Sequence, residues 1–78
     1  MSTRRYQIRT AEDVGRTVAE ARLFRGLTQE QLAAKARVER TYLAKIEAGH
    51  TVQQIERLLA LLRSLGVELY ATQERADG

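Results

Sequence analysis

Two short amphipathic segments, joined by about three residues, lie between residues 27 and 49 and constrain the fold of this chain most. Thr28, with Gln31 three residues later, forms a capping box that begins the first helix, which we expect over about 29–36. We expect the second helix over about 40–48, because a glycine suited to a left-handed backbone follows it. Two helices joined so tightly must pack against each other, which predicts a compact helix-turn-helix unit.

The flanking sequence predicts further helices that complete one small domain over residues 10–66. Thr10 is a good N-cap for a helix over about 11–25. A second capping box, which begins at Thr51, precedes a helix over about 52–64. The inward positions expected on these two helices are Val14, Val18, Ala21 and Phe24, and then Ile55, Leu58, Leu59, Leu62 and Leu65. The predicted class is therefore all-α, with four or five helices.

Weak strand patterns occur near both ends of the chain. Residues 67–72 alternate apolar and polar side chains, and residues 6–9, within an N-terminal arm over 1–9, do so more weakly. A lone strand is unstable in water, so the C-terminal strand needs a partner. We expect that partner to be a second copy of the chain. The alternative is pairing with residues 6–9 of the same chain, with a dimer formed through the last helix alone. Residues 73–78 are expected to be a flexible tail. The expected dimer interface comprises Leu62, Leu65, Val67, Leu69 and Tyr70.

Composition argues against several classes of function. The 78 residues include no cysteine and a single histidine, His50, so no metal site and no catalytic triad are expected. We therefore expect neither enzymatic activity nor a cofactor. No apolar run is long enough to span a membrane, and no signal peptide is visible, which predicts a cytoplasmic protein.

The net charge of +3 is unevenly distributed. Residues 1–50 hold ten Lys and Arg against six Asp and Glu, whereas residues 51–78 hold three against four. The positive field thus accompanies the helix pair, as expected for a surface that binds nucleic acid.

Several spaced motifs between Val14 and Val67 resemble the phage-repressor-like helix-turn-helix family, of the Xre or Cro/cI type. The matching positions are Gly26-Leu27-Thr28-Gln29, Leu32-Ala33, Val38, Leu43 and Ile46-Glu47 followed by Gly49. The resemblance implies a lambda-repressor-like DNA-binding domain. Residues 58–69 look most like the end of HipB-type antitoxins, in which a short C-terminal strand joins two subunits.

This resemblance implies roles for individual residues. Gln29 matches a glutamine that touches phosphate and reaches the first base pair, and Arg22 and Glu47 match an ion pair between the first and third helices. The outward positions of the recognition helix are matched by Glu39, Arg40, Thr41, Ala44 and Lys45, while Thr28, Arg37 and His50 complete the expected DNA-binding set.

Alternatives remain for several of these residues. Arg40 can fork onto guanine or contact phosphate, and Thr41 can read a thymine methyl group or simply occupy the first helical turn. Lys45 is expected to contact DNA. His50 is either an ordinary loop residue or a phosphate ligand.

Two positions depart from the family pattern. The family usually has glycine where this chain has Arg37, and a left-handed non-glycine residue costs about 1 kcal/mol. The family favours serine or threonine where this chain has Glu39, which is a poorer cap and repels phosphate. Glu39 could instead accept a hydrogen bond from cytosine or pair with a neighbouring arginine.

The leading functional hypothesis is a homodimeric repressor that binds a palindromic double-stranded DNA operator. Its sharper form is the antitoxin of a HipBA-like module, which represses its own operon and holds a HipA-like toxin. A stand-alone phage-type regulator is the alternative within this class. A protein-interaction module that has lost DNA binding is the rival from another class.

Overall fold

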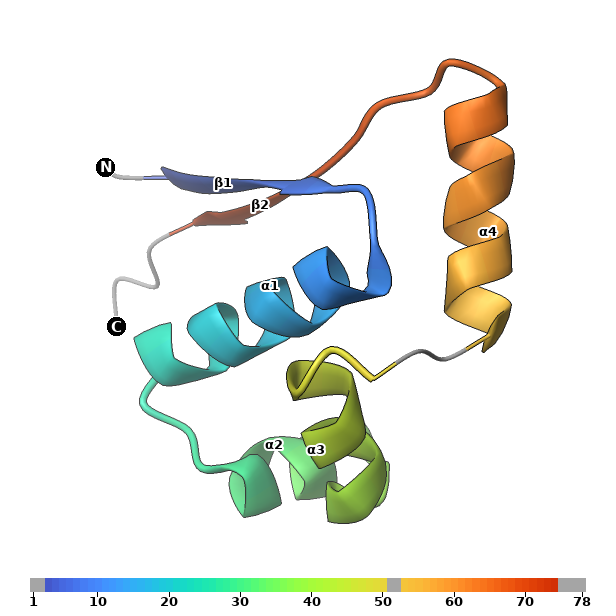
Figure 1. Ribbon diagram of the computed structural model, residues 1–78. Coiled ribbons are helices and arrows are strands. Elements are labelled where there is room, and N and C mark those ends of the chain that lie inside the picture. Colours follow the sequence, from blue (N-terminus) through green and yellow to red (C-terminus); the bar gives the residue numbers. More distant parts are fainter. Residues whose placement is uncertain (1–2, 51–52, 75–78) are drawn as a thin grey trace.

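The computed structural model describes residues 3–50 and 53–74, which form four helices and a small two-stranded sheet (Figure 1). The elements follow one another as β1 (Thr3–Ile8), α1 (Ala11–Phe24), α2 (Gln29–Ala36), α3 (Arg40–Glu47), α4 (Gln53–Ser64) and β2 (Leu69–Glu74). The predicted class, a small helical domain with a short C-terminal strand, is confirmed. No helix in the described part of the chain is long and apolar enough to cross a membrane.

Side-chain caps set the beginnings of α1 and α2, as the sequence predicted. The Thr10 hydroxyl accepts from the Asp13 backbone N–H at 3.2 Å, and the Asp13 carboxylate accepts in return from the backbone N–H of Thr10, which completes a capping box. A further backbone N–H, that of Arg9, donates to Asp13 at 2.9 Å and lowers the pKa of its carboxyl. The capping box expected at Thr51 lies outside the described residues.

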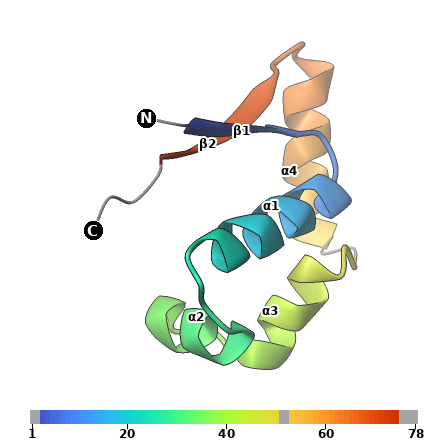
Figure 2. The same ribbon diagram turned by 90° about the vertical axis from the view of Figure 1, so that its left-hand side faces the viewer.

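The sheet joins the two ends of the described chain. β1 pairs antiparallel with β2, from Thr3 opposite Glu74 to Ile8 opposite Leu69. This is the intrachain pairing that the sequence left as the alternative. β1 extends into residues expected to be a polar arm, and β2 begins two residues later than the predicted 67–72, so its last residues belong to the expected tail. Figure 2 shows the sheet on the side of α1 away from α2 and α3.

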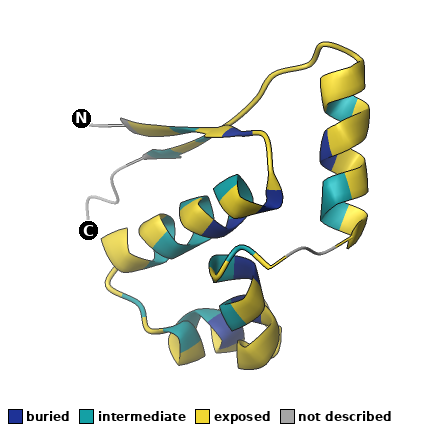
Figure 3. Ribbon diagram, in the orientation of Figure 1, coloured by how far each residue is buried: buried dark blue, intermediate teal, exposed yellow. Residues whose placement is uncertain are grey.

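A small core ties these elements together (Figure 3). Its buried side chains are Ile8, Ala11, Ala33, Leu43, Ile46 and Leu59. Gly15, buried in the middle of α1, allows a close contact between helices: a Cβ there would lie 2.0 Å from the Ile46 carbonyl oxygen of α3. That distance is far below van der Waals contact, so glycine is required for α1 to lie against α3. Of the predicted inner face of α1, Phe24 is 37% exposed and lies beneath the Arg4 guanidinium, 5.0 Å from its ring centre.

Helix α4 stands beside this body rather than within it (Figure 1). Its contacts include a hydrogen bond of 2.8 Å from the Ala11 backbone N–H to the Glu56 carboxylate and one from Arg63 to the Arg9 carbonyl oxygen. The predicted apolar stripe is only partly inward: Leu59 is buried, but Leu58 is 58% exposed and Leu65 75%. The periodicity located an apolar face correctly without indicating what covers it.

Candidate nucleic-acid interface

The helix pair begins at a well-formed cap. The Thr28 hydroxyl accepts from the Gln31 backbone N–H at 3.0 Å, and the Gln31 side chain accepts from the Thr28 backbone N–H at 2.8 Å. Both groups of the predicted capping box are therefore engaged. The first turn of α2 is thus fixed by its N-cap residue, Thr28, together with Gln31 of the helix itself.

The turn between α2 and α3 has the strained backbone that the sequence predicted. Arg37 has φ 60° and ψ 44°, and it is the sole non-glycine residue with positive φ in the described part of the chain. The backbone N–H of Val38 donates to the Ala33 carbonyl oxygen at 3.0 Å, which closes α2 in a Schellman-like turn. A side chain on this left-handed residue costs about 1 kcal/mol. The exposed guanidinium is the feature that distinguishes Arg37 from the usual glycine.

Helix α3 starts without a side-chain cap. Glu39 occupies the N-cap position with φ −75° and ψ 143°, but its carboxylate accepts no capping hydrogen bond. Glutamate thus behaves here as the poorer cap that the sequence indicated. The orientation of α3 must consequently come from its tertiary contacts.

An ion pair provides the main polar contact between α1 and the end of α3. Arg22 donates through Nε to one Glu47 oxygen at 2.8 Å and through Nη2 to the other at 3.0 Å, while its Nη1 donates to the Leu27 carbonyl oxygen at 2.8 Å. The two side chains are 13% and 7% exposed. The Arg22 hydrogen bonds hold the pKa of Glu47 below its ordinary value, and they raise that of Arg22.

Gln29 extends this ion pair to the start of α3. Its amide nitrogen donates to Glu47 Oε1 at 3.1 Å, and its amide oxygen accepts from Arg40 Nη1 at 3.2 Å. A continuous hydrogen-bonded chain therefore runs from Arg22 through Glu47 and Gln29 to Arg40. The family resemblance assigned Gln29 to phosphate and did not indicate its contacts with Arg40 and Glu47. These residues are 11 and 18 positions from Gln29 and meet it only because α2 packs on α3.

Most of the residues expected to contact DNA lie on the solvent-facing side of the helix pair. Arg40 and Lys45 have no acidic partner among the described residues. The exposed members of the set are Thr28, Arg37, Glu39, Arg40, Thr41, Lys45 and His50, and the half-buried members are Gln29 and Ala44. The face thus combines four basic or polar groups of α3 and its preceding turn with one acid, Glu39. Such a surface can donate hydrogen bonds to an anionic polymer.

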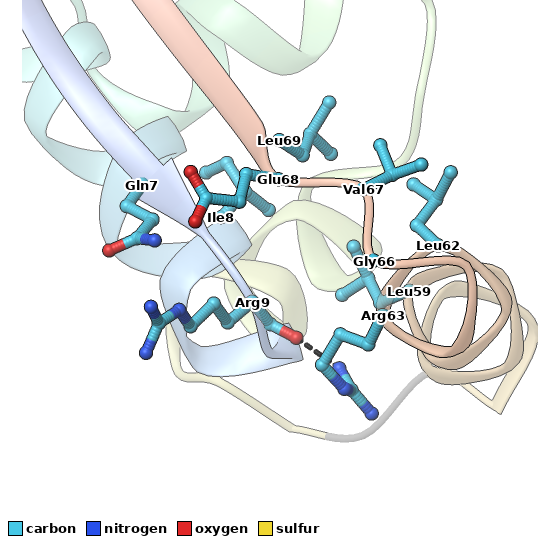
Figure 4. A pocket seen from close by; sticks show the side chains of 10 residues that line it. All are labelled: Gln7, Ile8, Arg9, Leu59, Leu62, Arg63, Gly66, Val67, Glu68 and Leu69. Carbon is cyan, nitrogen blue, oxygen red and sulfur yellow. Dashed lines mark hydrogen bonds between the residues drawn. The ribbon is translucent and has the colours of Figure 1, made fainter.

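A second surface, on α4 and the segment after it, is apolar. Leu61 is 63% exposed and lies with Leu58 on one face of α4, and Leu65, the residue directly after the helix, continues this face. Leu62 is half-buried. Val67, Leu69 and Tyr70 continue the exposed apolar surface at 45%, 39% and 38%. A groove of about 330 Å³ lies alongside, with Ile8, Leu59 and Leu62 among its apolar lining residues and Arg9, Arg63 and Glu68 among its charged ones (Figure 4).

Comparison with known proteins places the fold and the helix pair in one family. A family model described as helix-turn-helix matches residues 18–71. This chain belongs to the helix-turn-helix family. The resemblance to its phage-repressor-like members is thereby confirmed, whereas the closer likeness to HipB-type antitoxins stays a prediction.

Two relatives are informative about the family. The chain is 34% identical over 71 residues to the uncharacterized HTH-type transcriptional regulator y4mF of Sinorhizobium fredii, covering 88% of this chain and 93% of that protein. It is 40% identical over 58 residues to the immunity repressor protein of Bacillus phage phi105, covering 74% of this chain but 40% of the phage protein. No solved structure matches the chain.

Proposed function

We propose that this protein is a transcriptional repressor that binds double-stranded DNA through α3. The observation that carries the proposal is the exposed face of α3, on a helix held by the Arg22–Glu47–Gln29 hydrogen-bonded chain. Within the part of the chain that the structure describes, Arg40 and Lys45 on this face have no acidic partner. The names of the two relatives, a transcriptional regulator and an immunity repressor, support the same conclusion. A helix-turn-helix uses such a helix to read base edges in the major groove.

The proposed roles divide between base recognition and backbone positioning. Arg40 is the candidate for a bidentate contact to guanine, and Thr41 for contact with a thymine methyl group. Lys45, Arg37 and His50 are assigned to phosphates, which set the register of the helix pair on the duplex. Gln29 orients Arg40 through its amide oxygen and keeps a second amide hydrogen that can donate to phosphate.

Salt dependence tests this function directly. A binding sequence selected from random duplexes would be labelled and titrated by fluorescence anisotropy at several salt concentrations. The affinity should fall steeply and linearly on logarithmic axes, because each phosphate contact releases condensed counterions. No selected sequence, or an affinity independent of salt, would favour the second candidate: a protein-interaction module. Glu39 beside the phosphate-facing turn is the observation that supports that candidate.

We further infer that the protein acts as a homodimer on a palindromic operator. The exposed apolar face of α4 supports this, because isolated chains rarely leave several leucines of one helix in water. Among the described residues β2 pairs with β1 alone, and its other edge can accept the same strand of a second copy. The two recognition helices would then lie about 34 Å apart, one turn of DNA.

The finer proposal is an antitoxin that represses its own operon in the cytoplasm, at the nucleoid, and holds a HipA-like toxin. The presence of a strand, β2, after the last helix supports it, although within one chain this strand pairs with β1. Co-expression with a kinase-like reading frame from the adjacent gene tests it: rescue of growth and co-purification are expected. If no such neighbour is toxic, a stand-alone phage-type regulator remains, and the likeness to the phage phi105 repressor favours that form.

A further inference from the structure

A second groove is lined by residues of α1, of the segment between α1 and α2, of α2 and, at Gln73, of β2. It has a volume of about 370 Å³, and apolar atoms of Val18, Leu27 and Leu32 form much of its lining. These three side chains are only half-buried. The volume lies in the range of small-molecule sites, which bury a largely apolar ligand and fix it with a few polar groups.

The charged groups that line this groove are all cationic, and Thr17 and Gln73 are its uncharged polar groups. Arg25 and Lys35 line it and are exposed, and neither has an ion-pair partner among the described residues. The third basic residue there, Arg22, is already engaged by Glu47 and by the Leu27 carbonyl oxygen. Among the described residues no acidic side chain lines the groove, in contrast to the one beside α4, which Glu68 lines.

We propose that this groove binds a single-chain amphipathic carboxylate, such as a medium-chain fatty acid. The apolar chain lies against Val18, Leu27 and Leu32, and Arg25 and Lys35 hold the carboxylate. An apolar tail gains by leaving water, and a charge-assisted pair with arginine supplies direction. The proposal concerns ligand binding by the protein without DNA, so it stands or falls independently of the function proposed above.

A ligand in this groove would contact α1, α2 and the end of β2 at once, and these elements make few direct contacts with one another. The groove is lined from α1, from α2 and, at Gln73, from β2. Among the described residues, the side chain of Gln73 makes one long hydrogen bond at this groove, of 3.5 Å, from its amide nitrogen to the Ala21 carbonyl oxygen. Occupation of the groove should therefore raise the melting temperature as well as shift nearby resonances.

Methyl-labelled protein titrated with decanoate below its micelle concentration tests the proposal. We expect saturable shifts of the Val18, Leu27 and Leu32 methyl resonances and a higher melting temperature. Decanol, which keeps the tail and lacks the charge, should bind about tenfold more weakly, because a lost charge-assisted hydrogen bond costs that much. Uniform shifts without saturation, or shifts confined to the α4 leucines, would overturn the proposal.

Matched variants separate the groove from general attraction between opposite charges. Arg25→Ala combined with Lys35→Ala should reduce decanoate affinity at least about tenfold and leave decanol binding unchanged. Arg57→Ala, which removes an exposed charge on α4, is the control and should change neither. Ala21→Leu should fill the groove and abolish both, with a dispersed spectrum showing that the variant is folded. An equal loss of decanoate affinity in the Arg57→Ala control would contradict specific binding at this groove.

Discussion

Arg22 and Glu47, 25 residues apart, join the last turn of α1 to the last residue of α3 through two hydrogen bonds of 2.8 and 3.0 Å. Both side chains are largely removed from solvent. Removal of one partner would leave the other charge without compensation in a site of low exposure. Glu47→Ala should therefore lower the free energy of unfolding by roughly 3 kcal/mol, measured by urea denaturation. Loss below about 0.5 kcal/mol, the level of an exposed pair, would contradict this role.

The same pair predicts a dependence of stability on pH. The pKa of Glu47 is lowered in the folded protein, chiefly by the hydrogen bonds from Arg22, relative to its ordinary value of 4.5. Its contribution is therefore fully present above pH 4.5 and is lost as the pH falls through the lowered pKa. Glu47→Gln should flatten this part of the stability profile below pH 4.5. Asp13→Asn is the necessary comparison, because the pKa of Asp13 is lowered too.

The recognition of DNA should divide between Arg40 and Lys45. If Arg40 reads guanine, Arg40→Ala should cost about 1–3 kcal/mol and relax the preference at one base pair of each half-site. Lys45→Ala should weaken all sequences alike and reduce the salt slope by about one. Selection of binding sites with each variant, followed by anisotropy titrations, measures both effects. Unchanged DNA affinity in both variants would move the function away from α3.

Gln29 offers a sharper test of how Arg40 is oriented. Gln29→Ala removes the 3.2 Å contact to Arg40 without removing the guanidinium, so specificity at the Arg40 base pair should weaken while Arg40 itself is present. The sequence could not predict this contact. Amphipathic spacing fixes which residues face outward, but the direction of two long side chains depends on the packing of α2 against α3.

Arg37→Gly should change stability and DNA affinity in opposite directions. Glycine adopts φ 60° without a Cβ clash, so the variant should gain up to about 1 kcal/mol in denaturation experiments. If the guanidinium contacts phosphate, DNA affinity should fall for all sequences and the salt slope by about one. Arg37→Ala, which keeps a Cβ, is the control: it should lose the same affinity without the gain in stability. If the Arg37→Gly variant binds DNA as tightly as the unmodified protein, the Arg37 guanidinium does not contribute to DNA binding.

The buried hydroxyl of Tyr6 is a feature of the sheet that the sequence did not predict. Its hydroxyl is buried, in the strand β1 that pairs with β2, and has no hydrogen-bond partner among the described residues. An unsatisfied buried hydroxyl costs about 1–3 kcal/mol. Tyr6→Phe should therefore keep the packing of the ring and raise the free energy of unfolding by about 1 kcal/mol. A loss of stability would indicate that the hydroxyl donates to a group outside the described residues, or to water.

Features of the fold that depend on residues close together in the sequence could be predicted, whereas features that depend on tertiary packing could not. The helix starts at Thr10 and Thr28 were predicted because a capping box involves residues three positions apart. The close approach at Gly15 was not predicted, because a lone glycine within a helical pattern does not say which backbone it meets. The apolar pattern of α4 placed Leu59 inside correctly. It could not distinguish a face that packs within the chain from one that packs on another molecule.

The exposed face of α4 gives the last prediction, which concerns the dimer. Leu61 and Leu65 are 63% and 75% exposed, so lysine at either position should cost the single chain little stability. If the two copies meet through this face, Leu61→Lys with Leu65→Lys should convert a dimer to a monomer in sedimentation experiments. The affinity for a palindromic operator should fall sharply with it, because two half-sites are then no longer bound together.

The control is Ala60→Lys, which adds the same charge at an exposed position on another side of α4. It should leave the dimer intact, since residues 60 and 61 lie about 100° apart around a helix of 3.6 residues per turn. Intrachain pairing of β1 with β2 already occupies one edge of β2, and no other described strand pairs with its second edge, where a symmetry mate could bind. A double-lysine variant that still sediments as a dimer would contradict association through α4, and would leave that free edge of β2 to hold the two copies together.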